Sequence, residues 1–163
     1  MNPIEIAVTG LVVTGLADLW QQILSRVAYF PIANWSLVGR RVGWMLRGVF
    51  RHRHIGDATV IRGEQAIGWV FHYNIGIVYA GLYLFVVDGL ANVELSLVNA
   101  LLFGLVTVTT PFLLMQPALG LGVMARHAVN RLQILFVTVT THIVFGVGLF
   151  IGFTATVFMQ SPD

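Results

Sequence analysis

The sequence predicts an all-α membrane protein: a polytopic bundle of four transmembrane helices, with an amphipathic interfacial helix in its first cytoplasmic connection. Of the 163 residues, 57% are hydrophobic and 10% are charged, whereas about 25% of residues are charged in a soluble domain. Four apolar stretches also reach the roughly 20 residues that a helix needs to cross a bilayer. We expect one integral membrane domain over residues 1–163, with spans at 6–29, 66–87, 95–119 and 132–158.

The first apolar stretch lies close to the N-terminus but is not typical of a removable signal peptide. A secretory signal normally has a basic segment before its apolar stretch and a small-residue cleavage site after it. Here no Lys or Arg precedes the stretch, and no such cleavage site follows. We therefore count residues 6–29 as a span. The chain contains no Cys, which excludes disulfides, thiolate metal sites and cysteine catalysis.

All nine basic residues are arginine, and their positions predict the orientation of the chain. If the spans alternate in direction, every arginine falls on one side, which the positive-inside rule identifies as the cytoplasm. Glu5, Asp88, Glu94 and Asp163 then fall opposite, so both termini should lie outside. The net charge of +2 follows from this asymmetry, and we expect no nucleic-acid partner. The arginines are Arg26, Arg40, Arg41, Arg47, Arg51, Arg53, Arg62, Arg126 and Arg131.

The cytoplasmic connection, residues 30–65, is too long for a simple turn, and its segment SLVGRRVGWMLRGVF has helical periodicity. One face is basic and aromatic and another is apolar, which is typical of a helix that lies on anionic lipid. Alternatively, some of its arginines cover a pocket and hold an anionic ligand. The basic face holds Arg40, Trp44, Arg47 and Arg51, and the apolar face holds Val38, Val42, Met45, Leu46 and Val49.

The segment RHRH follows, at residues 51–54. His52 and His54 could bind a metal from an extended backbone, where residues i and i+2 point the same way. The neighbouring arginines repel cations, so we interpret the segment as a basic surface and predict no metal site. Further on, Arg62 and Glu64 form either a local ion pair or charges at the start of a helix, where a glutamate is favourable.

Polar residues inside the spans gather in the cytoplasmic half. An ionised carboxylate near the middle of a bilayer costs at least about 2.5 kcal/mol, so Asp18 should point into the bundle and have a partner or a proton. The expected depths of His72 and His142 place both in the same half of the membrane. We predict a polar pocket there, formed by Asp18, Gln21, Gln22, His72, Tyr73, Gln116 and His142.

The third span supports a cavity, because it contains two prolines and a glycine-rich exit. Pro111 and Pro117 each lack a backbone donor and favour a kink. Distorted backbone at membrane depth normally lines a protein interior or a water-filled space. We therefore expect the third helix to be distorted beside the pocket.

These polar residues have three interpretations. In the first they are hydrogen bonds between helices, while glycines permit close packing. In the second they form a pocket that binds a small anionic or amphiphilic molecule or exchanges protons. In the third, His72 and His142 are the axial ligands of haem b; otherwise we predict no cofactor, and no reaction is indicated. The packing glycines would be Gly10, Gly15, Gly76, Gly81, Gly104, Gly146, Gly148 and Gly152.

Five ordered motifs resemble a bacterial inner-membrane family catalogued as domain of unknown function 2938. They are NWSLVGRRVG, RGVFRH, RGEQAIGWVFHYNIG, PFLLMQPALGLG and THIVFGVGL. The family is more distantly similar to the YagU-like small membrane proteins, which are linked to acid tolerance. The resemblance implies a small polytopic protein without an assigned activity. Its matching positions are Asp18, Asn34, Trp35, Arg40, Gly43, Arg47, His52, Arg62, Glu64, Trp69, His72, Tyr73, Gln116, Asn130 and His142.

So many matching polar residues favour a functional pocket over packing alone. The resemblance therefore implies a pocket rim formed by Arg40, Arg47, His52, Arg62 and Glu64. The opposing interpretation is a structural or accessory subunit of a larger membrane complex. Besides the lipid bilayer, a second copy of the chain is a possible partner, because glycine-bearing faces permit close helix contacts.

Overall fold

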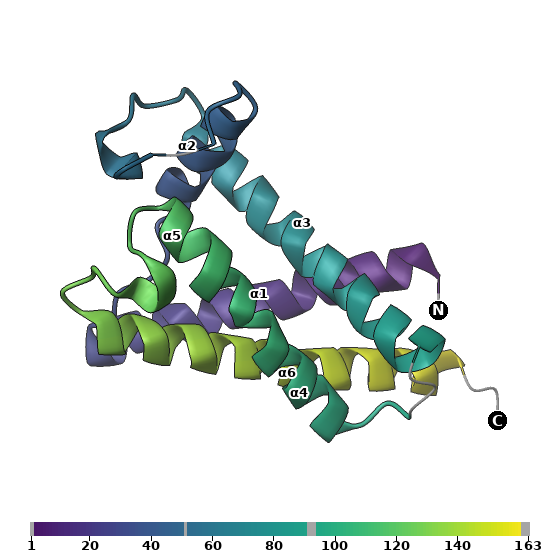
Figure 1. Ribbon diagram of the computed structural model, residues 1–163. Helices are drawn as coiled ribbons and strands as arrows, with labels where there is room; N and C mark the ends of the chain where they lie inside the picture. Colours follow the sequence, from purple (N-terminus) through teal and green to yellow (C-terminus); the bar gives the residue numbers. More distant parts are fainter. Residues whose placement is uncertain (1, 51, 91–93, 161–163) are drawn as a thin grey trace.

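A computed structural model describes residues 2–50, 52–90 and 94–160, and it confirms the predicted fold class. Four helical stretches are long and apolar enough to cross a membrane, as expected of a multi-pass membrane protein (Figure 1). Among the described residues there is no β-strand. The four stretches are Pro3–Ala28, Glu64–Val87, Leu97–Ala118 and Arg131–Phe158.

The spans are continuous α-helices in two cases and contain π-helical turns in the other two. The α-helices are α1 (Pro3–Ala28), α2 (Trp35–Met45), α3 (Glu64–Leu84), α4 (Leu97–Thr107), α5 (Gln116–Ala118) and α6 (Arg131–Gln160). The π-helical turns are η2 (Phe85–Leu90) and η3 (Pro111–Met115), and the 3-10 turns are η1 (Ile55–Asp57) and η4 (Val123–Ala125).

Local sequence signals set the ends of α1. The side chain of Asn2 accepts hydrogen bonds from the backbone N–H groups of Ile4 and Glu5, and the carboxylate of Glu5 accepts one from the N–H of Asn2. This reciprocal capping box satisfies donors that have no partner within the helix. Pro3 occupies the first helical position, where its missing N–H costs nothing. The helix ends at Tyr29, whose φ of 54° is left-handed.

The bundle has a close-packed apolar half. Helix α1 packs against α3 and α6, and α4 packs against α6 (Figure 1). The apolar core lies toward the end where α1 begins and α3 ends (Figure 1), and it includes the fully buried side chains of Tyr83, Leu149 and Phe153. The predicted cavity half is therefore the opposite one, where α1 ends and α3 and α6 begin.

Glycines allow the helices of this core to approach closely. A Cβ atom at Gly10 of α1 would lie 2.6 Å from the Cα of Ile77 in α3. One at Gly104 of α4 would lie 2.4 Å from the carbonyl oxygen of His142 in α6. Because lipid tails are as apolar as the side chains, such close contact is a main source of helix association in a membrane. The expected glycine packing is thus present at two of the helix interfaces.

The third span is distorted at the position expected from its prolines. Helix α4 ends at Thr107, and the π-helical turn η3 begins at Pro111. Proline has no N–H to donate and its ring excludes regular helix, so the backbone widens into a π-turn there. Pro117 then lies in the short helix α5.

Helix α2 lies directly against the start of α3. A Cβ at Gly39 would lie 1.7 Å from the carbonyl oxygen of Glu64, and one at Gly68 would lie 1.8 Å from that of Trp35. The two helices run in opposite directions with their backbones in contact. The helix ends at Met45, although periodicity predicted it to continue to Phe50; Gly48, with a φ of 79°, reverses the chain there.

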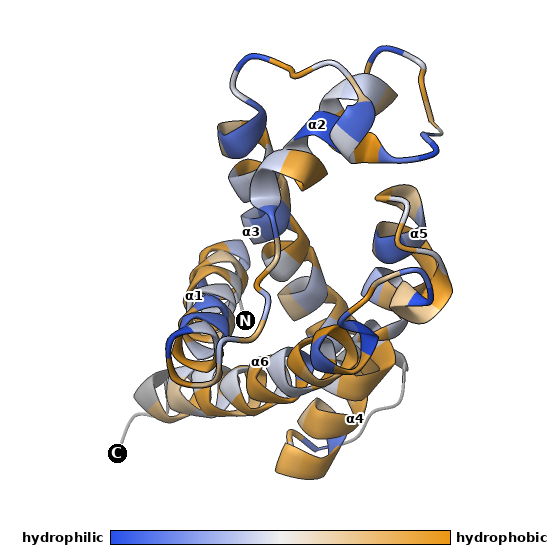
Figure 2. Ribbon diagram, turned by 90° about the vertical axis from the view of Figure 1, so that its left-hand side faces the viewer, coloured by the Kyte–Doolittle hydropathy of each residue, from blue (hydrophilic) through white to orange (hydrophobic). Residues whose placement is uncertain are grey.

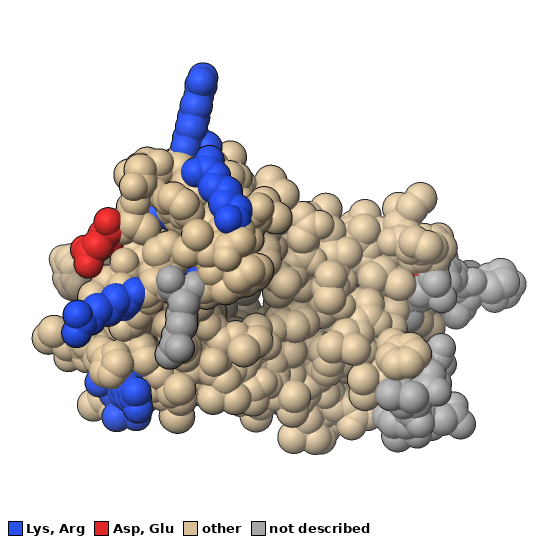
Figure 3. All heavy atoms as spheres, turned by 45° about the horizontal axis from the view of Figure 1, so that its top comes forward, with Lys and Arg blue, Asp and Glu red and all other residues tan. Residues whose placement is uncertain are grey.

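Charge and hydropathy separate along the bundle. Figure 3 shows the exposed arginines of one face gathered at one end. Figure 2 shows many hydrophilic residues in α2 and the loops beside it, whereas α4 is mostly hydrophobic. We call the end that carries residues 29–63 and 119–130 the arginine end. The arginine distribution used for the orientation is thus preserved in space, although Arg51 and Asp163 lie outside the described residues.

The contact between α2 and α3 predicts a sharp difference between two glycines. A Gly68→Ala substitution should destabilise the protein by about 2 kcal/mol or more, because its methyl group overlaps the backbone of α2. Gly56→Ala is the matched control, since a Cβ there meets nothing within 4 Å. Thermal unfolding in mild detergent measures both. Equal unfolding temperatures for the two variants would show that α2 does not pack closely on α3.

Candidate functional site

A central cavity of about 370 Å³ lies between the long helices at the arginine end. Its polar lining includes Gln21 of α1, His72 of α3, Gln116 of α5 and His142 of α6, together with Asn34, Thr110, Thr138 and Thr141. Residues 31–35 and the start of α2 cover it on one side. Four of the seven predicted pocket residues therefore line one space, and most of the rest of its wall is apolar.

A second cavity of about 370 Å³ adjoins the first. It is lined by Asp18, Gln21 and Gln22 of α1, by residues 32–36, and by Gln65 and Trp69 of α3. Gln21 and residues 32–35 belong to both linings, so they separate the two spaces. The predicted pocket residues are thus divided between a central and a lateral cavity, rather than gathered in a single one.

Asp18 and His72 form a pair where the two cavities meet. The Nε2 of His72 lies 2.9 Å from Oδ1 of Asp18, which provides the intramembrane carboxylate with the partner it was expected to need. The indole of Trp35 stacks on the His72 ring with 3.8 Å between centroids. The imidazole is therefore held on one edge by a carboxylate and on one face by the first residue of α2. Within the part of the chain that the structure describes, the second carboxylate oxygen of Asp18, Oδ2, is buried and makes no hydrogen bond.

Tyr73 lies beside this pair but lines neither cavity. Its ring contacts His72 edge-on, with 5.5 Å between centroids. A Cβ at Gly15 of α1 would lie 3.8 Å from the Tyr73 hydroxyl. Tyr73 thus packs between α1 and α3, on the Asp18 side of the interface.

His142 is held in a defined tautomer on the opposite wall of the central cavity. Its Nδ1 lies 2.8 Å from the hydroxyl oxygen of Thr107, and that hydroxyl donates its own proton to the carbonyl oxygen of Gly104 at 2.7 Å. Since the hydroxyl has only one proton and gives it to Gly104, Nδ1 of His142 donates to the hydroxyl. In a neutral ring, Nε2 is then an acceptor.

Two further polar atoms of the central cavity have no partner. Oε1 of Gln116 and Oγ1 of Thr141 are buried and accept no hydrogen bond from the described residues. Both side chains line the cavity. A buried polar atom without a partner destabilises the folded protein by about 1–3 kcal/mol. A molecule in this space that formed hydrogen bonds with both atoms would remove this destabilisation twice.

The haem b hypothesis stays a prediction. Hydrogen bonds occupy Nε2 of His72 and Nδ1 of His142, so an iron would have to use the opposite nitrogen of each ring. Among the described residues, no group of three or more His, Asp or Glu side chains is arranged to hold a metal ion.

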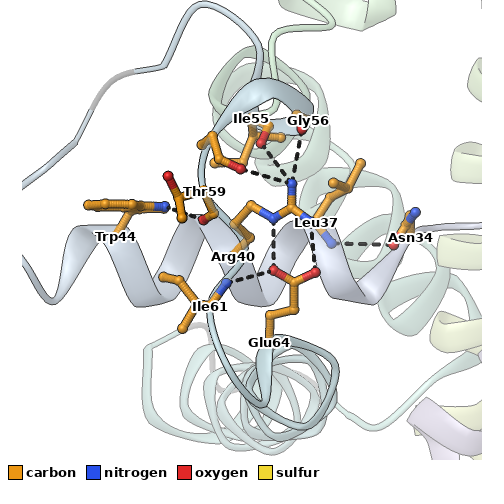
Figure 4. A network of polar contacts seen from close by, with 10 residues as sticks. Asn34, Leu37, Arg40, Trp44, Ile55, Gly56, Thr59, Ile61 and Glu64 are labelled. Carbon is orange, nitrogen blue, oxygen red and sulfur yellow. Dashed lines mark hydrogen bonds and ion pairs between the residues drawn. The ribbon is translucent and has the colours of Figure 1, made fainter.

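Arg40 and Glu64, both expected at the pocket rim, are instead bound to each other (Figure 4). Nε and Nη2 of Arg40 donate to the two carboxylate oxygens of Glu64, at 2.7 and 2.8 Å. Its Nη1 donates to the carbonyl oxygens of Gly56 and Ala58, at 3.0 and 3.1 Å. The hydrogen bonds to Glu64 raise the pKa of Arg40. This guanidinium is fully engaged within the protein and is not free to bind lipid or an anion.

Glu64 was expected either to pair with Arg62 or to place its charge at the start of a helix. The structure shows the second role, because Glu64 is the first residue of α3. Its carboxylate also accepts a hydrogen bond from the backbone N–H of Ile61 at 3.2 Å. Arg62 is exposed. None of the five rim residues lines the central or the lateral cavity: Arg47 lies over the ring of Trp44, 5.4 Å from its centroid, and His52 lines a separate cleft.

The residues that close the two cavities were not predicted as site residues. Residues 31–33 and Asn34 and Trp35 line the central space, and Gln65 and Trp69 contribute to the lateral one. The available signal was Asn34, which caps α2 by accepting a hydrogen bond from the N–H of Leu37. That cap fixes where α2 begins and therefore where the indole of Trp35 lies.

A family described as protein of unknown function (DUF2938) matches residues 7–158. No curated protein and no solved structure matches the chain.

The part-buried ion pair gives a prediction about stability. Arg40→Gln should destabilise the protein by about 1–3 kcal/mol, because it leaves the Glu64 carboxylate without its partner. Arg62→Gln removes the same charge from an exposed site and should change stability by no more than about 0.5 kcal/mol. Chemical denaturation in detergent compares them. If the Arg40 variant unfolded at the same denaturant concentration as the control, the pair would not hold α2 to α3.

Proposed function

Since the chain belongs to the DUF2938 family, whose description assigns no activity, we propose a function from the cavities: the central one binds a small amphiphilic molecule. The volume of about 370 Å³ falls within the 300–1,000 Å³ or so that is typical of ligand sites. Such sites have mostly apolar walls and a few polar groups that fix orientation. The central cavity has that composition, because Gln116, Thr141, His72 and His142 interrupt an otherwise largely apolar wall.

The observation that carries this proposal is the pair of unpartnered atoms, Oε1 of Gln116 and Oγ1 of Thr141. An amide oxygen can only accept a hydrogen bond, so the ligand must present a donor such as a hydroxyl or an N–H group. The Nε2 acceptor of His142 fits the same requirement. The rest of the ligand should be apolar, because it would contact Ile75, Met115 and Val137.

A second candidate, proton exchange, rests on the Asp18–His72 pair. Two titratable groups 2.9 Å apart can pass a proton directly between them, and histidine changes charge near neutral pH. The pair stands between a central and a lateral cavity, and Oδ2 of Asp18 makes no hydrogen bond to any described residue. If the chain moves protons, Asp18→Asn should abolish acidification of proteoliposomes. Unchanged acidification would exclude this pair as the path.

We also place the arginine end in the cytoplasm of a bacterial inner membrane, with both termini outside. The arginines at that end support this orientation. A single cysteine in place of Ser96, near the opposite end, would report it in this cysteine-free chain. A membrane-impermeant maleimide should label it from the periplasm. Labelling only after the membrane is permeabilised would show that the chain has the opposite orientation.

Native mass spectrometry of the protein purified in mild detergent tests the binding proposal. The wild-type chain should retain a small molecule, and the double variant Gln116→Leu, Thr141→Val should retain about tenfold less, because two hydrogen bonds are worth roughly 1.4 kcal/mol or more. Thr154→Val is the matched control on α6, since this threonine is exposed away from the cavity. A bare-chain mass for the wild type would contradict the proposal and favour an accessory subunit, and a haem band in its visible spectrum would establish the haem alternative.

A further inference from the structure

A third cavity, of about 720 Å³, lies at the arginine end, outside the two cavities described above. It separates the segment after α2 from the segment that joins α5 to α6. Three arginines and three histidines line it, and its described lining contains no Asp or Glu. We call it the basic cleft; its charged and titratable residues are Arg41, His52, Arg53, His54, Arg126 and His127.

Arg41 is a buried cation without a carboxylate. It is only 9% exposed, and its Nη groups donate to the backbone carbonyl oxygens of Val49, at 3.3 Å, and Phe50. Its Nε is buried and has no partner among the described residues. Burial lowers the pKa of Arg41. The adjacent Arg40, by contrast, forms an ion pair with Glu64. A buried charge without a counterion is costly, and an anion in the basic cleft would supply one.

His52 adds a second unsatisfied group to the same wall. Its Nδ1 is buried and has no hydrogen-bond partner in residues 2–50, 52–90 and 94–160, and its ring lies 5.9 Å from that of Trp44, centroid to centroid. The opposite wall carries Arg126, whose Nε donates to Nε2 of His127 at 3.1 Å. Nε2 of His127 is therefore occupied as an acceptor, while no hydrogen bond from the terminal nitrogens of Arg126 to the described residues is seen.

Close backbone contact holds the two walls together. Gly120 has a φ of 89°, and a Cβ there would lie 2.7 Å from the carbonyl oxygen of Arg53. Gly122 has a φ of 73°, and a Cβ there would lie 2.7 Å from Cγ of Arg126 in its own wall, so this glycine shapes that wall. Only glycine fits both the left-handed backbone and these contacts. The cleft is therefore built by the fold, and its arginines are not simply neighbours on a mobile surface.

We propose that the basic cleft binds a phosphate group, carried either by an anionic phospholipid or by a small soluble phosphate. Guanidinium groups present paired donors that match phosphate oxygens. The cleft is lined by three positively charged side chains, those of Arg41, Arg53 and Arg126. This arrangement attracts a dianion and repels a metal ion. The proposal does not depend on the central cavity, since none of these six residues lines it.

The test uses the full-length protein and two probes. Inorganic phosphate is titrated into the protein in neutral detergent at constant ionic strength, with thermal unfolding as the readout. Phosphatidic acid is compared with phosphatidylcholine in native mass spectra of the same protein. Saturable stabilisation by phosphate identifies a soluble ligand, preferential retention of phosphatidic acid identifies a lipid headgroup, and either result supports the proposal.

Variants separate the cleft from general charge attraction. Arg53→Gln with Arg126→Gln should weaken the observed binding about tenfold or more, because charge-assisted hydrogen bonds are lost. Both side chains are exposed, so this variant should fold even if Arg41→Gln does not. Arg26→Gln removes an arginine at the same end that does not line the cleft, and it should bind as the wild type does. No saturable binding by either probe, or an equal loss in the Arg26 variant, would overturn the proposal.

Discussion

The contact of α2 with the start of α3 organises the arginine end of this protein. Gly39 and Gly68 bring the two backbones together. This contact sets the positions of the side chains that α2 carries. Trp35 reaches the ring of His72, and Arg40 reaches Glu64. Arg41, one residue further on, contacts the loop after α2 and lines the basic cleft. One short helix therefore closes the central cavity and forms part of a second candidate site.

The two halves of the bundle differ in how closely their helices pack and in how their polar groups are satisfied. Toward the termini, glycines such as Gly10 and Gly104 let apolar helices pack without space between them. Toward the arginine end, the polar side chains Asp18, Gln116 and Thr141 keep unpartnered atoms beside open volume. Lipid cannot satisfy those atoms. Among the described residues, five of the six buried side-chain atoms without a hydrogen-bond partner lie in this half, and the sixth is the hydroxyl of Tyr83 in the apolar core. Such an uneven distribution is expected of a site that a ligand completes.

Residue patterns predicted much of the bundle, because its dominant constraint is the bilayer itself. Span length follows from hydrocarbon thickness, and the inward direction of Asp18 follows from the cost of charge in lipid. The distortion at Pro111 follows from a missing N–H group. Periodicity could not show which neighbour covers a helix face. Arg40 was therefore expected at the membrane surface, whereas Glu64, 24 residues away, holds it inside. The basic cleft was missed because the contact between its walls is made at a left-handed turn at Gly120, which periodicity does not show.

Cross-linking between α2 and α3 in native membranes tests the central claim most directly. The chain contains no cysteine, so the pair Ser36→Cys, Gln65→Cys introduces the only thiols, and both positions line the lateral cavity. A short bismaleimide should join this pair within one chain, whereas Ser36→Cys with Ser96→Cys, at opposite ends of the bundle, should stay unlinked. If both thiols of the first pair reacted with a monofunctional maleimide but never with each other, α2 would not lie on α3.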